Sequence, residues 1–282
     1  MKKATTFLVL ILVLALVFSF AACKQKTEYP VEINETVIDI APDKVASLSN
    51  VTNAVIKLMG YDDRLVTGEF GSPLKVNVEN LILADVSLLF TPTELSQNTK
   101  EQLENVGVKI VKLSTPENYE QLKEYYKAVG SCMGGNITGE EEAMNITRDM
   151  DESFKNIETF LKGKQSFSYI FLYEENIAAN NISFANNILN LCGGKNKVTN
   201  ENNIDNNKLK TLNPNVLIVN KGLKEKIENN SELKEMDAVK NNKIVEIDVN
   251  NFNLMAEGFM NILYDILDTQ YPDFLNDSTQ KE

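Results

Sequence analysis

The chain has 282 residues, enough for one large domain or two lobes of ordinary size, and it is acidic, with 28 Lys and Arg residues against 40 Asp and Glu. Such a surface repels nucleic acid and anionic lipid. Nucleic-acid binding and other functions that rely on contacts to phosphate groups are therefore disfavoured. The sequence holds no histidine and no tryptophan. Histidine-based catalytic triads and imidazole metal sites are therefore excluded, and the best residue for stacking a flat ligand is missing.

The first 23 residues have the order of a bacterial lipoprotein signal. Lys2 and Lys3 precede an apolar run over 7–20, and Ala21-Ala22-Cys23 closes it. The run is shorter than the ~20 residues that a membrane-spanning helix needs, which disfavours a membrane span. We expect a signal peptide over 1–22, cleavage before Cys23 and attachment of diacylglycerol to its sulfur. The mature chain would then be a lipoprotein anchored to the cell membrane and would work outside the cytoplasm.

Residues 23–41 are mostly polar and include one β-type run, Thr36–Ile40, which predicts a lipidated tether followed by an edge strand. Once Cys23 carries lipid, Cys132 and Cys192 remain, either as a pair or as two buried thiols. They lack the spacing of a disulfide framework. We therefore expect separate thiols rather than a disulfide, even in an oxidising compartment.

Residues 42–137 alternate short apolar runs with helical patterns and predict an N-terminal α/β lobe. Thr52 is expected to cap a helix that stops at Gly60, and Thr115-Pro116-Glu117 to open another. Strands that alternate with helices of this length indicate βα units on a parallel sheet. The expected strands are 44–49, 65–67, 86–90 and 108–113, and a further helix covers 95–106.

Residues 138–162 break this rhythm with one long amphipathic pattern. Thr138-Gly139-Glu140-Glu141 has the form of a capping box, and Lys162-Gly163 ends the pattern with a cation and a C-terminal glycine. Between these signals, apolar residues recur every three or four positions. A helix over 139–162 would be about 36 Å long at 1.5 Å per residue, so we expect a rigid rod that connects two lobes.

The alternation resumes over 163–282 and predicts a C-terminal α/β lobe. The turn at Gly193-Gly194 leads into a polar, Asn-rich stretch over 196–207. The expected strands are 168–173, 216–219 and 243–248, and the expected helices are 183–191, 208–212, 223–227, 233–236 and 254–270. The fold class that follows is α/β: two βαβ lobes with mainly parallel sheets, joined by one long rigid α-helix, with a ligand cleft between the lobes.

Seven short segments form a series between Pro42 and Pro272. In chain order they are PDKVASLS (42–49), MGYDDRLV (59–66), NVE (77–79), LENVGVKIV (103–111), NILNLCGGKN (187–196), LNPNVLIV (212–219) and AVKNNKIV (238–245). Taken together and in this order, they resemble the class III substrate-binding proteins of ABC importers, the siderophore, cobalamin and haem receptors with a helical backbone. The resemblance covers essentially all of the expected mature chain.

This resemblance implies a periplasmic binding fold whose cleft is largely preformed, because a rigid crossing helix allows only a small hinge. Ligands of open α/β sheets lie at the loops that follow the carboxyl ends of the strands. Such a protein is not an enzyme, and we expect it to hold no metal or cofactor of its own. The candidate ligand-binding residues on those loops are Ser49, Asn50, Asn53, Glu69, Phe70, Thr91, Tyr173, Asn220, Phe252 and Asn253.

Family members carry an acidic residue on the outer face of each lobe, which pairs with arginines on the permease. Glu79 matches the first, although an acid in a first helical turn also complements the helix dipole. The second position falls on Asn207, which cannot form an ion pair, and Asp205 is the nearby substitute. The resemblance thus implies a permease with its ATPase as partners, docked through Glu79 and through Asp205 or Asn207.

The composition also bears on the ligand. Arginine occurs only at positions 64 and 148, whereas family members clamp anionic ferric siderophores with arginines. A neutral or cationic ligand, such as a corrinoid or a hydroxamate siderophore, therefore suits the expected lining better. Haem would need an iron ligand other than histidine, and Tyr173 and Tyr61 are the candidates.

Two other interpretations compete with the importer receptor. A surface lipoprotein could keep the two-lobed scaffold for binding a partner, without transport, because the second acid is missing and arginines are scarce. An enzyme has less support, since Glu174 and Glu175 are adjacent and face different directions. The acids at 140–142 are expected to cap a helix.

Overall fold

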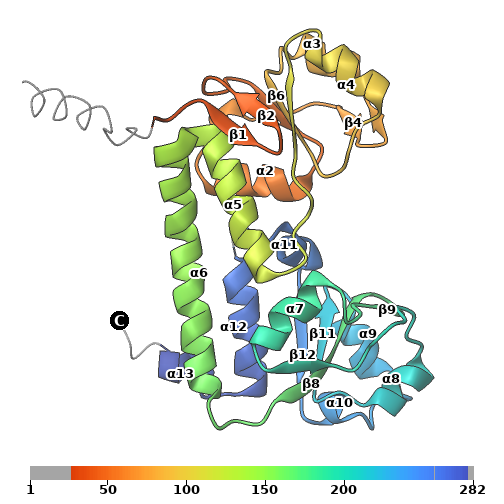
Figure 1. The fold of residues 1–282 in the computed structure, drawn as a ribbon. Helices are drawn as coiled ribbons and strands as arrows, with labels where there is room; N and C mark the ends of the chain where they lie inside the picture. Colours follow the sequence, from red (N-terminus) through yellow and green to blue (C-terminus); the bar gives the residue numbers. More distant parts are fainter. Residues whose placement is uncertain (1–26, 257, 279–282) are drawn as a thin grey trace, which may run out of the picture.

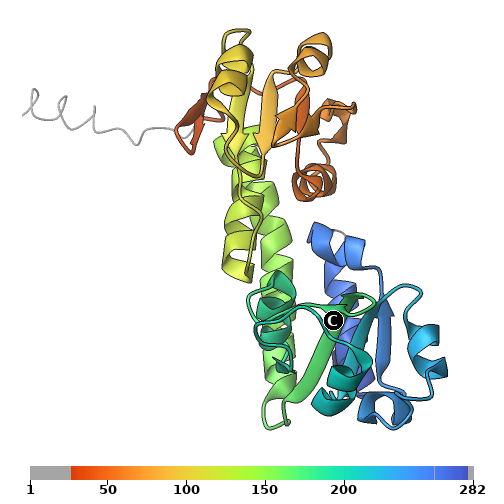
Figure 2. The same cartoon turned by 90° about the vertical axis from the view of Figure 1, so that its right-hand side faces the viewer.

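The computed structural model describes residues 27–256 and 258–278 and folds into two α/β lobes connected by a helical hairpin (Figure 1). The expected signal peptide and Cys23 lie outside the described residues. Among the residues that the structure describes, no helix is both long and apolar enough to cross a membrane. Figure 2 shows the lobes stacked one above the other, with the hairpin along one side.

The N-terminal lobe contains a parallel sheet in the order β3-β6-β7, formed by β3 (Val45–Ser47), β6 (Leu88–Thr91) and β7 (Lys109–Lys112). All four residues of β6 are buried, as expected for a central strand covered on both faces. The helices of this lobe are α2 (Asn50–Leu58), α3 (Val78–Leu83) and α4 (Gln97–Glu104), with the short η1 (Asp62–Arg64). Two antiparallel hairpins complete the lobe, β1 (Val31–Ile33) with β2 (Thr36–Ile38) and β4 (Gly71–Ser72) with β5 (Lys75–Val76).

Two sequence predictions for this lobe are wrong. Residues 65–67 form only an isolated bridge, in which Leu65 pairs with Val45, because the chain leaves the sheet edge at once. The N-cap of α2 is Ser49 rather than Thr52, and the Ser49 hydroxyl accepts a hydrogen bond from the Thr52 amide at 3.3 Å. Thr52 is buried instead, and its hydroxyl lies 2.6 Å from that of Tyr125.

The hairpin consists of α5 (Tyr119–Gly134), the π-helical turn η2 (Gly135–Gly139) and α6 (Glu140–Leu161). The predicted start of α5 is early, since its N-cap is Asn118, which accepts from the Gln121 amide at 3.0 Å. The chain reverses direction at Gly135, which has a φ of 88°, and then enters α6 through η2. The predicted capping box of α6 is not formed, because the residue before α6, Gly139, is already helical and α6 has no side-chain cap. The two helices pack closely: an added Cβ at Gly130 or Gly139 would overlap the backbone of the other glycine.

The prediction of one long connecting helix is confirmed by α6, whose 22 residues span about 33 Å. It packs on α5 from Gly139 down to Phe154, whose ring lies 4.6 Å from that of Tyr119 at the start of α5. At its lower end the Phe160 ring packs against the rings of Tyr271 and Phe274, at 5.8 and 5.0 Å. The helix therefore connects the two lobes directly.

The C-terminal lobe is built on a sheet in the order β10-β8-β11-β12, all parallel, with β9 antiparallel to β8. The strands are β8 (Phe167–Glu174), β9 (Ile177–Ala178), β10 (Gly194–Asn196), β11 (Val216–Asn220) and β12 (Ile244–Ile247). The helices are α7 (Phe184–Leu191), α8 (Asn206–Leu212), α9 (Lys224–Asn229), α10 (Asp237–Lys240), α11 (Val249–Leu254), α12 (Phe259–Gln270) and α13 (Phe274–Ser278).

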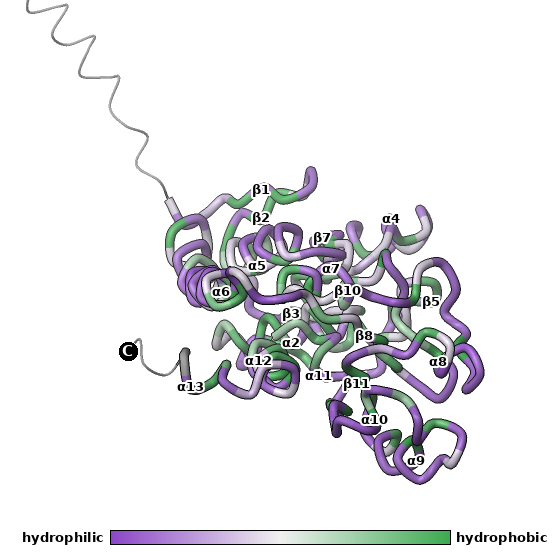
Figure 3. Tube along the Cα trace, turned by 90° about the horizontal axis from the view of Figure 1, so that it is seen from below, coloured by the Kyte–Doolittle hydropathy of each residue, from purple (hydrophilic) through white to green (hydrophobic). Residues whose placement is uncertain are grey.

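The predicted terminal helix over 254–270 is wrong at its start. The chain forms α11, then adopts positive φ at Met255 and Gly258, and only then enters α12. Residues 233–236 form turns rather than a helix. Figure 3 shows that α9 and the rim of the molecule are mostly hydrophilic, whereas hydrophobic segments gather towards the middle, around α2 and α12.

The two buried cysteines stay apart. Cys132 and Cys192 are free thiols with no exposed surface, and burial raises the pKa of each to about 12. The prediction of separate thiols is confirmed. With both sheets, their helices and the connecting α6 in place, the predicted fold class is confirmed as well.

Candidate functional site

A cleft of about 1080 Å³ lies between the two lobes. Its upper wall is one face of α2, from Asn50 to Lys57, and its lower wall consists of α11 and the start of α7. The loop that leads into α5 closes one side. The lining residues that carry polar side chains are Ser49, Asn50, Asn53, Lys57, Thr115, Glu117, Ser183, Asn250 and Asn253.

The upper wall is positioned by the turn between β3 and α2. The Ser47 hydroxyl accepts from the Ser49 amide at 3.0 Å and donates to the Ser49 carbonyl at 3.1 Å, which fixes the turn. Ser49 then caps α2, so Asn50 and Asn53 stand in the first turn of the helix, on the cleft. The buried bond between Thr52 and Tyr125 ties this turn to α5.

The lower wall is positioned by Asp248 at the end of β12. Its carboxylate caps α11 by accepting from the amides of Asn250 and Asn251 at 3.0 and 3.3 Å. Lys221 forms an ion pair with the same carboxylate at 3.1 Å, and this hydrogen bond lowers the pKa of Asp248. Asn250 and Asn253 of the capped helix then line the cleft.

The floor of the cleft is held by bonds that cross between the lobes. The buried Tyr126 hydroxyl of α5 donates to the Met255 carbonyl at 2.5 Å. The Asn187 side chain of α7 donates to the Glu117 carbonyl at 2.7 Å. Helices α2 and α11 also pack against each other. These contacts fix the distance between the walls, so the cleft is preformed rather than created by a large hinge motion.

Four asparagine side chains of the cleft are available to a ligand. Within the described part of the chain, the side-chain amides of Asn50, Asn53, Asn250 and Asn253 make no hydrogen bond. An amide offers both donors and acceptors, so these groups suit a polar ligand of either kind. Lys57 and Glu117 are the charged residues of the lining, and their charges offset each other.

The structure places the predicted ligand-binding residues in two groups. Ser49, Asn50, Asn53 and Asn253 line the interlobe cleft, and their role in binding stays a prediction. Glu69, Phe70, Thr91, Tyr173, Asn220 and Phe252 are not among its lining residues.

These six residues take part in local structure instead. Thr91 is buried, and its hydroxyl donates to the Thr93 carbonyl at 2.8 Å. Phe252 is fully buried against Phe171, Phe184 and Phe259.

The remaining four follow the same pattern. Phe70 is buried in the core of the N-terminal lobe. The Tyr173 ring packs at 4.9 Å from Phe171. Asn220 accepts from the Val249 amide, and the Glu69 carbonyl accepts from Asn80. Strand ends thus position the walls, while the side chains on the cleft come from the helices that follow.

The sequence analysis missed several lining residues, chiefly Pro92, Thr115, Pro116, Ile182 and Phe184. One signal could have found part of this wall. The apolar Ile182 interrupts a polar run between Asn181 and the helix cap Ser183, and the structure leaves it 75% exposed on the cleft beside Phe184. The loop over 115–117 gave no such signal, because it was read as the first turn of α5.

The two tyrosines considered for haem lie outside the cleft lining. The Tyr61 hydroxyl donates to Glu142 on α6, far from α11 and α7, and burial with this hydrogen bond raises the pKa of Tyr61. Tyr173 is half-buried in the C-terminal lobe. The described residues also contain no cluster of Cys, Asp and Glu that could hold a metal ion.

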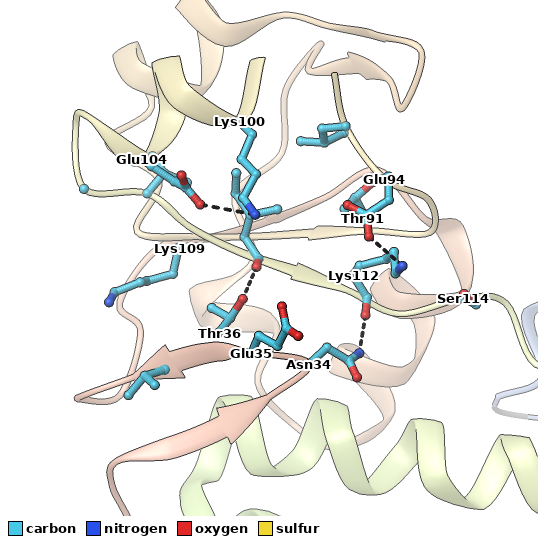
Figure 4. A pocket seen from close by; sticks show the side chains of 15 residues that line it. Asn34, Glu35, Thr36, Thr91, Glu94, Lys100, Glu104, Lys109, Lys112 and Ser114 are labelled. Atoms are coloured by element: carbon cyan, nitrogen blue, oxygen red, sulfur yellow. Dashed lines mark hydrogen bonds and ion pairs between the residues drawn. The ribbon is translucent and has the colours of Figure 1, made fainter. Parts of the chain in front are cut away.

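A second cavity of about 940 Å³ lies at the outer edge of the N-terminal lobe, away from the cleft (Figure 4). It is a seam, where the hairpin β1–β2 covers the edge strand β7. The side chains of Asn34 and Thr36 donate to the carbonyls of Lys112 and Ile110, both at 2.7 Å. The ammonium of Lys112 pairs with Glu94 at 2.6 Å. Several of its polar groups therefore bond to one another.

The candidate docking residues lie on the two outer ends of the molecule. Glu79 is exposed in the first turn of α3, which follows the cap Asn77. Asp205 is the N-cap of α8 and accepts from the Lys208 amide at 2.7 Å. Asn207 stands in the first turn of α8. Figure 1 shows α3 at the upper end and α8 at the lower end, both away from α6.

Comparison with known proteins places this geometry in a family. The profile for the family described as "Periplasmic binding protein" matches residues 26–250. No curated protein sequence matches the chain.

Among solved structures, the haem-binding protein RhuT from Roseiflexus sp. RS-1 is similar with a TM-score of 0.67 and 13% identity, covering 82% of this chain and 99% of that one. The vitamin B12 binding protein BtuF of Vibrio cholerae gives 0.66 and 14%, covering 86% and 99%. An ABC transporter substrate-binding protein from Listeria monocytogenes EGD-e gives 0.62 and 16%, covering 83% and 100%.

These structures share the arrangement of two α/β lobes seen here. The alignment with this chain covers nearly the whole length of each of them. The family match spans most of the chain, and the resemblance drawn from the seven sequence segments is confirmed. This chain belongs to the periplasmic binding protein family, and its two lobes with a helical backbone have the fold of these solved structures.

Proposed function

We propose that this protein is the membrane-anchored, extracytoplasmic substrate-binding component of an ABC importer, and that its ligand is a corrinoid or a hydroxamate siderophore of little net charge. The observation that carries the proposal is the interlobe cleft of about 1080 Å³, lined by amides that make no other described hydrogen bond. Ligand cavities typically measure about 300–1,000 Å³, so this cleft suits a large ligand.

The charge of the cleft supports the choice of ligand class. A strongly anionic ligand would need cations that converge on it, whereas the lining offers Lys57 against Glu117. Arg64 is engaged elsewhere, since its guanidinium donates to the Met133 carbonyl at 2.7 Å. Arg148 lies on α6, outside the cleft lining. The amide groups of a corrinoid, or the amides and hydroxamates of a siderophore, match asparagine side chains.

Haem is the less favoured ligand of the three. Solved neighbours include haem-binding proteins, such as RhuT. Here neither Tyr61 nor Tyr173 lines the cleft, and the chain has no histidine. A haem in this cleft would therefore lack the axial ligands that the sequence analysis had considered.

Delivery to a permease rests on the outer acids. Glu79 stands exposed at one end of the molecule, as a docking acid should. At the other end the Asp205 carboxylate is used as a helix cap, and Asn207 is neutral. Attachment of Cys23 to lipid keeps the protein beside the membrane in which the permease lies.

A thermal-shift screen tests the ligand proposal. A ligand at about a hundred times its dissociation constant adds about 2.7 kcal/mol to the stability, which raises the melting temperature measurably. We expect a shift with a corrinoid or a ferric hydroxamate. The double variant Asn53→Trp and Asn253→Trp, which fills the cleft from both walls, should lose it. The matched control Asn145→Ala, on the outer face of α6, should keep it. The absence of any shift across corrinoids, siderophores and haem would remove the transport function.

The alternative is a partner-binding lipoprotein that has kept the scaffold without transport. The observation in its favour is the second docking position, where an acid serves as a cap and its neighbour is an amide. Reversing Glu79 to Lys and measuring ATPase stimulation of the cognate permease separates the two. A transport component should stimulate the ATPase and lose coupling on this reversal, whereas a wild-type protein that gives no stimulation favours partner binding.

A further inference from the structure

The first described residues of the chain are fastened to the end of the helical hairpin. We call this end, residues 133–148, the hairpin tip. The Glu28 carboxylate accepts from the amides of Ile137 and Thr138 at 3.0 and 3.2 Å, and from the Thr138 hydroxyl at 2.7 Å. The Glu28 carbonyl accepts from the Asn136 amide at 2.9 Å. Glu28 thus bonds to three successive residues of η2, to Asn136 through its carbonyl and to Ile137 and Thr138 through its side chain.

Neighbouring residues extend this clamp on both sides. The Asn136 side chain donates to the carbonyls of Thr27 and Pro30, at 3.2 and 2.9 Å. The Tyr29 hydroxyl donates to the carbonyls at the end of α5, and burial raises its pKa to about 12. The absence of a side chain at Gly135 makes space for the Glu28 carboxylate, since an added Cβ would lie 2.5 Å from it. The start of the described chain is therefore fixed to the tip.

The distance to the proposed lipid anchor is short. Three residues separate Thr27 from Cys23. Four residue steps span at most about 14 Å when fully extended. An acylated Cys23 must sit at the bilayer surface, so the tip cannot lie much farther from that surface than this reach. This step rests on the proposed lipid anchor.

The surface of the tip suits contact with lipid headgroups. Ile137 and Met144 expose 43% and 57% of their surface there. Together with Glu140, Glu141 and Arg148 they line a shallow groove of about 570 Å³. The Arg148 side chain is 70% exposed, so its guanidinium can reach lipid phosphates. The carboxylates of Glu140 and Glu141 oppose deep insertion of the tip into the bilayer. We therefore expect the tip to contact a zwitterionic bilayer at the level of the headgroups.

The geometry points to the hairpin tip as the membrane-facing surface of this protein while it is not docked to a permease, held against a phospholipid bilayer by the clamped tether. Since α6 is about 33 Å long and leads away from the tip, the C-terminal lobe stands farther from the bilayer than the N-terminal lobe. The tether orients the receptor as well as retaining it.

Energy transfer to the bilayer measures this orientation. The acylated protein is placed in phosphatidylcholine vesicles that carry an acceptor dye on the headgroups, and a donor dye is attached through an azide-bearing amino acid at position 137 or at position 210 on α8. We expect transfer from position 137 to exceed that from position 210 by at least about twofold, because the length of α6 separates them. Equal energy transfer from the two positions, or more from position 210, would show that the tip faces water or a protein partner rather than the bilayer. That result would overturn the proposal.

Two variants identify the clamp as the cause. Glu28→Ala removes the carboxylate that holds η2, so the difference between the two positions should shrink while the acyl chains stay in place. Glu32→Ala, on an exposed acid of β1, should leave the difference intact. An unchanged difference in the Glu28 variant would contradict the proposed role of the clamp.

Acylation itself is measured separately, by the mass of the intact protein and by its flotation with the vesicles. If Cys23 proves unmodified, the proposed anchor fails by that reading alone. The orientation is then tested in the chain that begins at Cys23, coupled through this thiol to a maleimide lipid. Cys132 and Cys192 are buried and do not compete for the reagent.

Discussion

The hairpin tip and the interlobe cleft lie at opposite ends of α5 and are built in opposite ways. At the tip, glycines bring α5 and α6 into backbone contact, and η2 bonds to the side chain of Glu28. At the cleft, the same helix begins beside asparagines whose amides have no described partner. The hairpin tip is therefore a rigid support, whereas the interlobe cleft leaves its polar side chains free to bind a ligand.

The largest effect is expected from breaking the frame at Gly139. Its Cα faces the Gly130 carbonyl, so the side chain of Gly139→Leu has to push α5 and α6 apart. Overpacking typically costs about 1–3 kcal/mol, and we expect the upper end of that range because the new side chain meets backbone atoms that support both lobes. Urea unfolding followed by circular dichroism measures the loss. Asn145→Ala, on the exposed face of α6, is the control and should change the stability by less than about 0.5 kcal/mol. Equal midpoints for the two variants would refute close glycine packing.

A smaller effect is expected at the floor of the cleft. Tyr126→Phe removes the hydroxyl that donates to the Met255 carbonyl and leaves that buried carbonyl unpaired. The expected loss of stability is about 1–3 kcal/mol. The same unfolding experiment detects it, with Tyr264→Phe on α12 as the matched control. If both variants unfold at the wild-type midpoint, this bond does not hold the lobes together.

A still smaller, pH-dependent effect belongs to the cap of α11. The pair with Lys221 lowers the pKa of Asp248 in the folded protein below its ordinary value near 3.9. The stability that it contributes is complete above that ordinary value and disappears as the pH falls through the lower folded value. Asp248→Asn keeps the cap and removes the charge, so it should lower the unfolding midpoint slightly at pH 7 and not at pH 2. An equal difference at both pH values would contradict the ion pair.

No reaction is expected between thiol reagents and the buried cysteines of the folded protein. Cys132 and Cys192 are buried with pKa values raised to about 12, so the thiolate is absent near neutral pH. The folded mature protein with its Cys23 blocked should take up no maleimide at pH 7.5, and two equivalents in denaturant. Rapid labelling of the folded protein would show that the lobes open to solvent.

Sequence reasoning succeeded where the signal is local and long. The periodicity over 139–162 extends through many turns, so α6 could be predicted even though its capping box does not form. The box failed because the chain turns back at Gly135 and enters α6 from the helical turn η2, where the Thr138 hydroxyl bonds to Glu28. Likewise, Leu65-Val66 reads as a strand, and yet it makes only one bridge with β3.

The candidate site was less predictable for a physical reason. Thr91 and Phe252 follow strands, as cleft residues should, but whether a side chain at a strand end faces the cleft or the core depends on tertiary packing. Helix α11 was missed because Val249-Asn250-Asn251 are weak helix formers, and it exists through the cap by Asp248. The partner of Glu28 lies 109 residues away in the sequence, beyond any local pattern.

Native mass spectrometry of the mature protein with a corrinoid and with a ferric hydroxamate tests the central claim most directly. The account predicts a one-to-one complex with one of them for the wild-type chain, and none for the variant with Asn53→Trp and Asn253→Trp, whose cleft is filled. A complex that survives in the filled variant would place the ligand elsewhere. The absence of a complex with either ligand in the wild-type protein would contradict the proposed receptor.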